Sequence, residues 1–150
     1  MSNAGLEVFD STLQKTHIVL DHIMQEMGWE NERQRAYLAL RSVLHALRDR
    51  LTMAEALDLG AQLPMLVRGF YYEGWKPADT PRKERHKEEF LAHVKHDFRN
   101  DERMDAEQIV RAVFRVLARH ISEGEIKDIQ LILPAELREL WSAEDVKTWV

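Results

Sequence analysis

The stretch that decides the fold occurs twice in the chain. Residues 41–71 read RSVLHALRDRLTMAEALDLGAQLPMLVRGFY, and residues 111–141 read RAVFRVLARHISEGEIKDIQLILPAELRELW. The two stretches align without a gap at a shift of 70 residues, and eight of their 31 positions are identical. The identical pairs are Arg41/Arg111, Val43/Val113, Leu47/Leu117, Glu55/Glu125, Asp58/Asp128, Leu63/Leu133, Pro64/Pro134 and Arg68/Arg138. Similarity at a fixed shift indicates an internal duplication.

Both copies carry the pattern of amphipathic helices. Apolar residues recur at three- and four-residue spacing over 12–27 and 36–51 in the first copy, and over about 81–98 and 109–121 in the second. No stretch alternates between apolar and polar residues as a half-buried strand does. The pattern therefore predicts an all-α protein.

Helix boundaries repeat as well. Thr52-Met-Ala-Glu55 and Ser122-Glu-Gly-Glu125 have the sequence of a capping box, in which a hydroxyl and a carboxylate satisfy backbone N–H groups at a helix start. About ten residues after the start of each capped helix, a leucine is followed by a proline, which is Pro64 in the first copy and Pro134 in the second. Both prolines suit the first turn of a short fourth helix. Residues 142–150 begin with a further capping sequence and predict a final short helix.

We therefore predict an all-α, compact helical bundle of two tandem multi-helix units related by a pseudo-twofold axis. A unit of about 60 residues is marginal alone, so each copy is expected to bury the apolar face of the other. The expected organisation is a flexible N-terminus at 1–11 with a tag remnant at 2–4, a first unit at 12–75, a connector at 76–87, and a second unit at 88–150 that includes the C-terminal helix.

Composition restricts the function. The chain has 150 residues, 45% of them hydrophobic, no cysteine and a net charge of −5. The absence of cysteine excludes disulfides, thiolate metal sites and thiol nucleophiles. No secretion signal and no run of about 18 apolar residues is present, so we expect a cytoplasmic protein without a membrane span. Net negative charge argues against nucleic acid as the partner.

Several segments resemble a known family. Residues 38–51, the run from Ala61 to Trp75, Glu88-Glu-Phe-Leu-Ala-His-Val94 and residues 110–141 are similar to the bacterial family known as domain of unknown function 2267. The resemblance covers about residues 12–141. It implies a helical, duplicated protein and carries no assigned activity, so no catalytic or binding residue is transferred by it.

The run Gly69-Phe-Tyr-Tyr-Glu-Gly-Trp75 is the first candidate site, because it places four aromatic residues at the end of the first copy. Tyr and Trp dominate the energetics of many protein interfaces. The candidate interaction surface is therefore Phe70, Tyr71, Tyr72 and Trp75. The alternative is that these rings fill the seam between the two copies.

Histidines offer a metal hypothesis. His93 and His96 lie three residues apart, and His22 is the counterpart of His93 in the first copy. Two such helices could meet as in a metal-binding helical bundle. The paired Glu-x-x-His signature of such bundles is missing, which favours a shared packing role, and we predict no metal ligand and no cofactor.

Charged residues offer two further hypotheses. Four charged positions are identical in the two copies, at 41/111, 55/125, 58/128 and 68/138. They could form a duplicated anion site. We favour the alternative that they form an ion-pair network within each unit. The connector has cations at Arg82, Lys83, Arg85 and Lys87, which could contact phosphate or form a solvated helix start, with Thr80 as N-cap and Pro81 in the first turn.

No nucleophile elbow, phosphate-binding loop or metalloprotease motif is present, so we predict no enzymatic activity. The function that remains is a protein-interaction or regulatory helical module with an unknown protein partner. The alternative is a ligand- or metal-binding helical bundle. Self-association is left open by the sequence.

Overall fold

The computed structural model describes residues 5–141. These residues form eight α-helices and one short 3-10 helix, with no β-strand among them, which confirms the all-α prediction. The helices are α1 (Glu7–Met27), α2 (Arg33–Arg48), α3 (Met53–Gln62), α4 (Met65–Tyr72), α5 (Lys87–Asp97), α6 (Ala106–His120), α7 (Glu123–Ile132) and α8 (Ala135–Arg138), with the 3-10 helix η1 (Pro77–Asp79) between α4 and α5.

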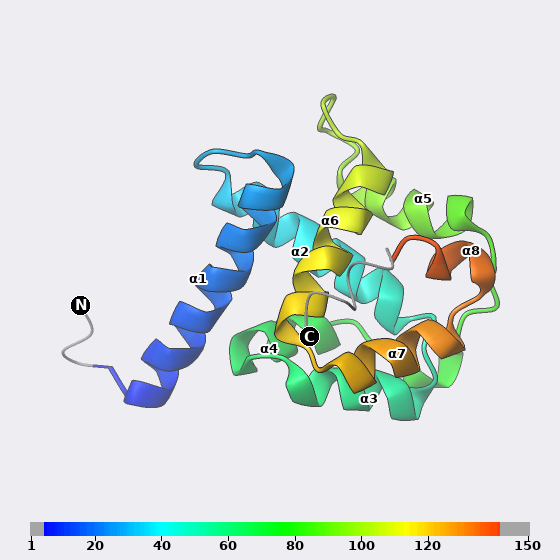
Figure 1. Ribbon diagram of the computed structural model, residues 1–150, viewed down its shortest axis with the longest axis horizontal. Helices are drawn as coiled ribbons and strands as arrows, with labels where there is room; N and C mark the ends of the chain where they lie inside the picture. Colours follow the sequence, from blue (N-terminus) through cyan, green and yellow to red (C-terminus); the bar gives the residue numbers. More distant parts are fainter. Residues whose placement is uncertain (1–4, 142–150) are drawn as a thin grey trace.

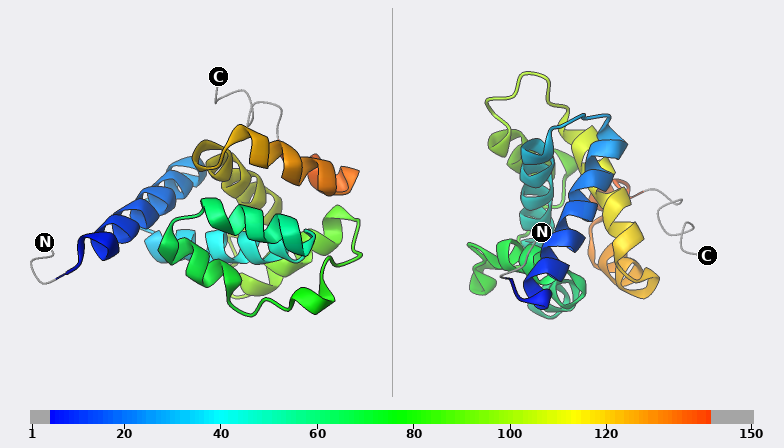
Figure 2. Two further views of the ribbon diagram at one scale, coloured as in Figure 1. Left: turned by 90° about the horizontal axis from the view of Figure 1, so that it is seen from below. Right: turned by 90° about the vertical axis from the view of Figure 1, so that its left-hand side faces the viewer.

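Helices α2 and α6 form the centre of the molecule and pack against each other (Figure 1). α1 packs against both of them, and so does α5. α4 packs against α1, while α8 packs against α5. Helices α3 and α7 lie side by side below the central pair, and the N-terminal end of α1 extends beyond the rest of the bundle (Figures 1 and 2). The α1–α2 and α1–α4 contacts have counterparts in the α5–α6 and α5–α8 contacts, whereas within residues 5–141 the α2–α4 and α3–α4 contacts have none of similar extent. The pseudo-twofold arrangement of two units stays a prediction.

The core is built from the apolar faces of the central helices. On α6, Ile109, Val110, Val113, Phe114 and Leu117 are each no more than 2% exposed. The apolar face of α2 is buried to the same degree, and both helices carry buried alanines that let neighbouring backbones approach closely. Burial of these two faces, with those of α1 and α5, supplies the main stabilisation of the fold.

The predicted capping hydroxyls are present. Thr52 Oγ1 accepts from the N–H of Glu55, and Ser122 Oγ accepts from the N–H of Glu125, both at 3.2 Å. The two capped helices, α3 and α7, are offset by the predicted 70 residues. Pro64 and Pro134 lie one position earlier than predicted, at the N-caps of α4 and α8.

Two helix starts differ from the prediction. α1 begins at Glu7, so residues 7–11 are helical and extend the expected helix by more than a turn. α5 begins at Lys87, with His86 at the N-cap; the predicted start at Thr80-Pro81 is wrong. The reason lies in the preceding segment, where the N–H of Arg82 donates to the carbonyl of Asp49 at 2.7 Å.

This bond, with the ion pair between Arg50 and Glu84 at 2.9 Å, holds the connector along the end of α2 in a non-helical course. The predicted tag remnant at 2–4 and the predicted helix at 142–150 lie outside the described residues. Among residues 5–141, none of the helices has both the length and the apolar character that a bilayer span requires.

Candidate functional site

An apolar groove of about 930 Å³ lies between α1, α2 and α4. The surface that lines it is mostly apolar, and its volume is that of a typical ligand site. The lining residues are Phe9, Thr12, Leu13, Thr16, His17 and Leu20 of α1, Arg33, Gln34 and Tyr37 of α2, Met65, Leu66, Gly69 and Phe70 of α4, and Glu73.

Large apolar side chains along this groove are exposed to solvent. Phe9 is 57% exposed and Leu13 47%, both on α1, while Met65 and Leu66 of α4 are 44% and 43% exposed. These four side chains lie around one concavity, whereas exposed apolar residues on most surfaces are scattered singly. A contiguous apolar surface of this kind is typical of a site where another molecule binds.

The wall formed by α4 is held from behind by basic side chains of α2. Arg48 is buried and donates to the carbonyls of Tyr71 and Glu73 at 2.7 and 2.8 Å. His45 donates from Nε2 to the carbonyl of Phe70 at 2.7 Å. Burial lowers the pKa of His45 and so favours the neutral ring that makes this bond. The last turn of α4 therefore keeps a fixed position under the groove.

The two outer walls are joined, and the charges at the rim are paired. The N–H of Leu66 donates to Oγ1 of Thr12 at 2.9 Å, which links the start of α4 to α1. Arg33 pairs with Asp21 at 3.2 Å, and Glu73 pairs with Arg41 at 3.5 Å. Since these rim charges are neutralised within the protein, the groove favours an apolar occupant over an ionic one.

The comparison with known families agrees with the resemblance seen in the sequence. The family model described as "Uncharacterized conserved protein (DUF2267)" matches residues 16–140. The chain belongs to this family. A search of curated proteins finds no match. The DUF2267 match includes the α2 and α4 walls of the groove, while Phe9 and Leu13 of the α1 wall precede it.

The four aromatic residues of the predicted interaction surface have different environments in this DUF2267 protein. Phe70 lines the groove and meets Tyr37 edge to face, with 5.2 Å between ring centroids. Tyr71 is fully buried, and its hydroxyl donates to the carbonyl of Ala56 at 2.7 Å. Tyr71 is therefore not part of any surface of the folded protein.

Tyr72 and Trp75 are half-buried and stack on each other with 5.5 Å between ring centroids. The ring of Tyr72 lies against Gly60 so closely that no side chain would fit at residue 60. The ring contacts of this run are with Tyr37 and among its own members. Phe70 and Tyr71 also belong to a hydrophobic core that includes residues of both halves, and the seam alternative stays a prediction.

Sequence reasoning missed the residues that make the groove apolar. Phe9 was assigned to a flexible segment, and Met65 and Leu66 were not singled out. One signal was available, since Leu6, Phe9 and Leu13 continue the three- and four-residue spacing of the predicted first helix. The sequence alone could not show that α4 lies opposite this stripe.

The histidine hypothesis is not supported by the positions of the described residues. His22 lies next to His120, with 2.9 Å between Nδ1 of His22 and Nε2 of His120, and not next to His93. Nε2 of His93 instead lies 3.3 Å from Arg82. Burial, Arg50 and Arg82 lower the pKa of His93. Neither contact brings His22, His93 and His96 together around one ion.

The ion-pair network predicted for the repeated charges does not include Arg68 or Arg138. Arg68 donates to the carbonyls of Gly60 and Leu63, at 2.8 and 2.9 Å. Arg138 makes the equivalent bonds to Gln130 and Leu133, at the same distances. These arginines therefore cap the last turns of α3 and α7 and do not pair with the repeated carboxylates.

Arg41 and Arg111 do form ion pairs within their own halves, as predicted, whereas the repeated carboxylates form none among the described residues. Arg41 pairs with Glu73 at 3.5 Å, and Arg111 pairs with Glu107 at 2.9 Å and with Glu139 at 3.9 Å. Glu55 and Glu125 face each other across α3 and α7, so like charges meet where opposite charges were predicted. The retained arginines and the retained carboxylates therefore make contacts in different parts of the fold.

The basic connector does not present four independent cations. Arg82 pairs with Glu84 at 3.2 Å, and Lys87 lies on α5, where it pairs with Glu139 at 2.9 Å and with Glu107 at 3.4 Å. The amines and guanidinium groups that would bind phosphate are therefore partly engaged within the protein. This arrangement disfavours the nucleic-acid alternative, although Arg82, Lys83 and Arg85 precede α5 and do not form the predicted helix start.

Proposed function

We propose that this protein is a non-enzymatic interaction module that binds an amphipathic helix of a partner protein in the groove between α1, α2 and α4. The observation that carries the proposal is the exposure of Phe9, Leu13, Met65 and Leu66 around one concavity. An amphipathic helix places apolar side chains at three- and four-residue spacing, and grooves between helices are a recurring way to bind it.

The dimensions of the groove suit a helix. Its α1 wall runs from Phe9 to Leu20, which is about 16 Å at the rise of an α-helix. A partner helix of about three turns would match this length. Drug-sized ligands usually bury most of their surface in a pocket, whereas this groove leaves its apolar walls exposed, which favours a longer occupant.

The proposal is tested by selecting helical peptides from a displayed library against the full chain. Selected peptides should carry apolar residues at positions i, i+3 or i+4, and i+7. Leu13→Asp should weaken their binding at least tenfold, because it puts a charge into the apolar wall. Leu131→Asp is the matched control, since Leu131 is 76% exposed on α7 and does not line the groove.

Equal loss of binding in both variants, or no loss in either, would contradict the assignment of the site. Sedimentation velocity of the unliganded chain tests whether a second copy of the chain, and not a partner helix, occupies the groove. If the wild-type chain forms a dimer that Leu13→Asp abolishes and Leu131→Asp does not, a second copy of the chain occupies the groove and the partner-helix proposal is wrong.

A further inference from the structure

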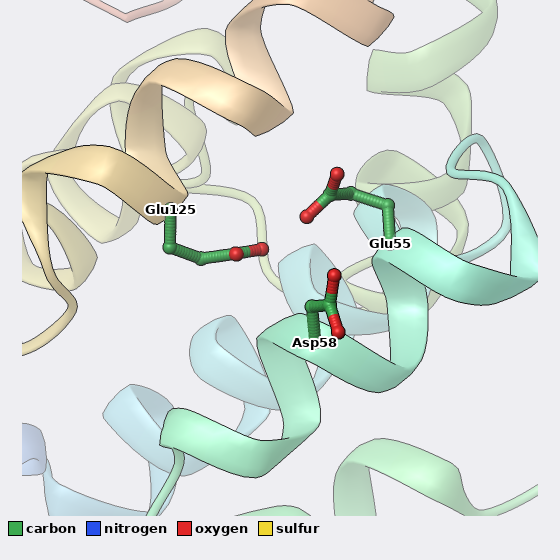
Figure 3. A group of neighbouring side chains, drawn as sticks. All are labelled: Glu55, Asp58 and Glu125. Carbon is green, nitrogen blue, oxygen red and sulfur yellow. The ribbon is translucent and has the colours of Figure 1, made fainter.

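A second feature lies on the far side of α3 from α4, where carboxylates of α3 and α7 converge. Glu55 and Asp58 project from α3 toward Glu125 of α7 (Figure 3). One oxygen from each of the three side chains lies within 4.8 Å of the other two. The cluster is separate from the apolar groove, none of whose lining residues it includes.

The two glutamates are not occupied by the capping role that their sequence predicts. In a capping box, the carboxylate at the third helical position accepts from the N–H of the capping residue. At the start of α7 that N–H, from Ser122, donates instead to Oε1 of Gln62 at 2.8 Å. Nε2 of Gln62 donates in turn to Oγ of Ser122 at 3.1 Å. The end of α3 therefore caps α7, and the carboxylate of Glu125 is turned toward Glu55.

Oε2 of Glu125 is a buried acceptor without a donor. Glu125 is only 7% exposed, and this oxygen has no hydrogen-bond partner among the described residues. Oε2 of Glu55 is buried and lacks a partner as well. The buried hydroxyl of Tyr71 supplies neither oxygen with a donor, because it donates to the carbonyl of Ala56. A buried acceptor without a donor destabilises the folded state, more so when it is charged, and a bound cation would satisfy both oxygens.

We propose that Glu55, Asp58 and Glu125 form a binding site for a hard divalent cation of the size of Ca²⁺. The ligand chemistry supports this choice, because the site offers carboxylate oxygens and neither nitrogen nor sulfur. Asp58 is exposed, so an ion can enter from solvent and reach the buried Glu125. Water molecules would complete the coordination sphere, as they do in many Ca²⁺ and Mg²⁺ sites.

The ligand set favours Ca²⁺ over Mg²⁺. Ca²⁺ accepts six to eight oxygen ligands in a flexible geometry, whereas Mg²⁺ demands near-ideal octahedral geometry and usually binds through only one or two carboxylates. Three carboxylates from two different helices suit the more adaptable ion.

Burial, the adjacent Glu55 and the carboxylates of Asp58 and Asp128 together raise the pKa of Glu125 to about 8. Without a cation the glutamate pair therefore holds a proton at neutral pH.

The test is isothermal titration calorimetry and thermal unfolding of the EDTA-treated chain with CaCl2, MgCl2 or MnCl2. The wild-type protein should bind one Ca²⁺ and melt at a higher temperature with it. Glu125→Gln should abolish both effects. Asp58→Asn, which changes only an exposed residue, should weaken Ca²⁺ binding about tenfold and shows the effect even if Glu125→Gln does not fold.

Glu123→Gln is the matched control, because it removes the same charge from the same helix at a residue that pairs with Lys127. It should leave Ca²⁺ binding unchanged. If none of the three salts gives a binding heat or changes the melting temperature of the wild-type protein, the pair serves only to share a proton and the cation site is refuted. Equal weakening in Glu123→Gln and Asp58→Asn would refute it too, since it would mean diffuse attraction to an acidic surface.

Discussion

The two halves of the duplicated sequence differ in the space between their first and fourth helices. In the first half this space is the groove, lined by Leu66 and Gly69 of α4. Their counterparts in the duplicated sequence are Glu136 and Glu139. Glu136 accepts from the N–H of Lys87 at 3.0 Å, and Glu139 pairs with the amine of Lys87 at 2.9 Å. In the second half, polar contacts therefore fill the space between the first and fourth helices. In the first half, the same space is left as an apolar and exposed groove.

The first helices of the two halves also differ in length. α1 has 21 residues and extends past α4, whereas α5 has 11 residues and begins where Glu136 and Glu139 hold it. Trp141, the counterpart of Tyr71, stacks on Phe114 with 4.0 Å between ring centroids. The comparison teaches that the duplicated elements maintain the fold, and that the first half carries an apolar surface that the fold itself does not require.

The largest expected effect on stability comes from Arg48→Ala. The counterpart of Arg48 in the second half is Ala118, so this buried arginine belongs to the first half alone. Its loss leaves the carbonyls of Tyr71 and Glu73 without their donor and leaves a cavity, which should cost about 3 kcal/mol. Urea denaturation measures this cost. Arg103→Ala, at a side chain that is 70% exposed, should cost less than about 0.5 kcal/mol, and equal costs would contradict the assigned role.

The next effect is a loss of stability with rising pH in the metal-free protein. The pKa of Glu125 is about 8 in the folded state, whereas the unfolded chain has the ordinary glutamate value of 4.5. The folded state therefore binds more protons between these values, and the free energy of unfolding falls as the pH rises through this window, by about 2–4 kcal/mol. Glu125→Gln should remove the slope.

Denaturation at several pH values between 5 and 9 in EDTA tests this expectation. The quantity to compare is the difference in the free energy of unfolding between the wild-type protein and Glu125→Gln. Contributions from the histidines cancel in this difference. A difference that does not change with pH would show that Glu125 titrates as an ordinary carboxyl.

Substituting the two capping hydroxyls compares the halves at equivalent positions. Thr52→Ala should cost about 1 kcal/mol, as is usual for an N-cap. Ser122→Ala should cost about 0.5 kcal/mol more, because its hydroxyl also accepts from Gln62. Thermal or urea unfolding of both variants gives the order. The reverse order would show that the bond to Gln62 adds nothing.

The smallest expected effect on stability comes from giving the groove the residues of the second half. Leu66→Glu with Gly69→Glu should change the free energy of unfolding by less than about 0.5 kcal/mol, since both positions are exposed. The same pair should abolish the binding of selected helical peptides. Retained binding would place the peptide elsewhere on the protein.

The sequence predicted those parts of the fold that depend on local chemistry. Capping hydroxyls, Leu-Pro boundaries and the helix period are local, and the helices they predict within residues 5–141 are present. The start of α5 could not be predicted, because it depends on the bond from Arg82 to Asp49, which is distant in sequence. The burial of Tyr71 depends on where α4 packs, a property of tertiary structure that composition does not reveal.

The candidate sites were predicted less well for the same reason. Phe70 was identified from its aromatic neighbours and does line the groove, but the opposite wall on α1 becomes visible only in three dimensions. The repeat correctly marked Glu55 and Glu125 as retained in both copies. Their mutual approach depends on Gln62 taking over the capping of α7, which no pattern in the sequence indicates.

The most direct test of the central claim is hydrogen–deuterium exchange of the full chain with and without a selected helical peptide. We predict that the peptide slows exchange in α1 and α4, which form the groove walls, and leaves α5 and α8 unchanged. Protection that falls on α5 and α8, or is spread evenly over both halves, would contradict the claim that the exposed surface of the first half is the binding site.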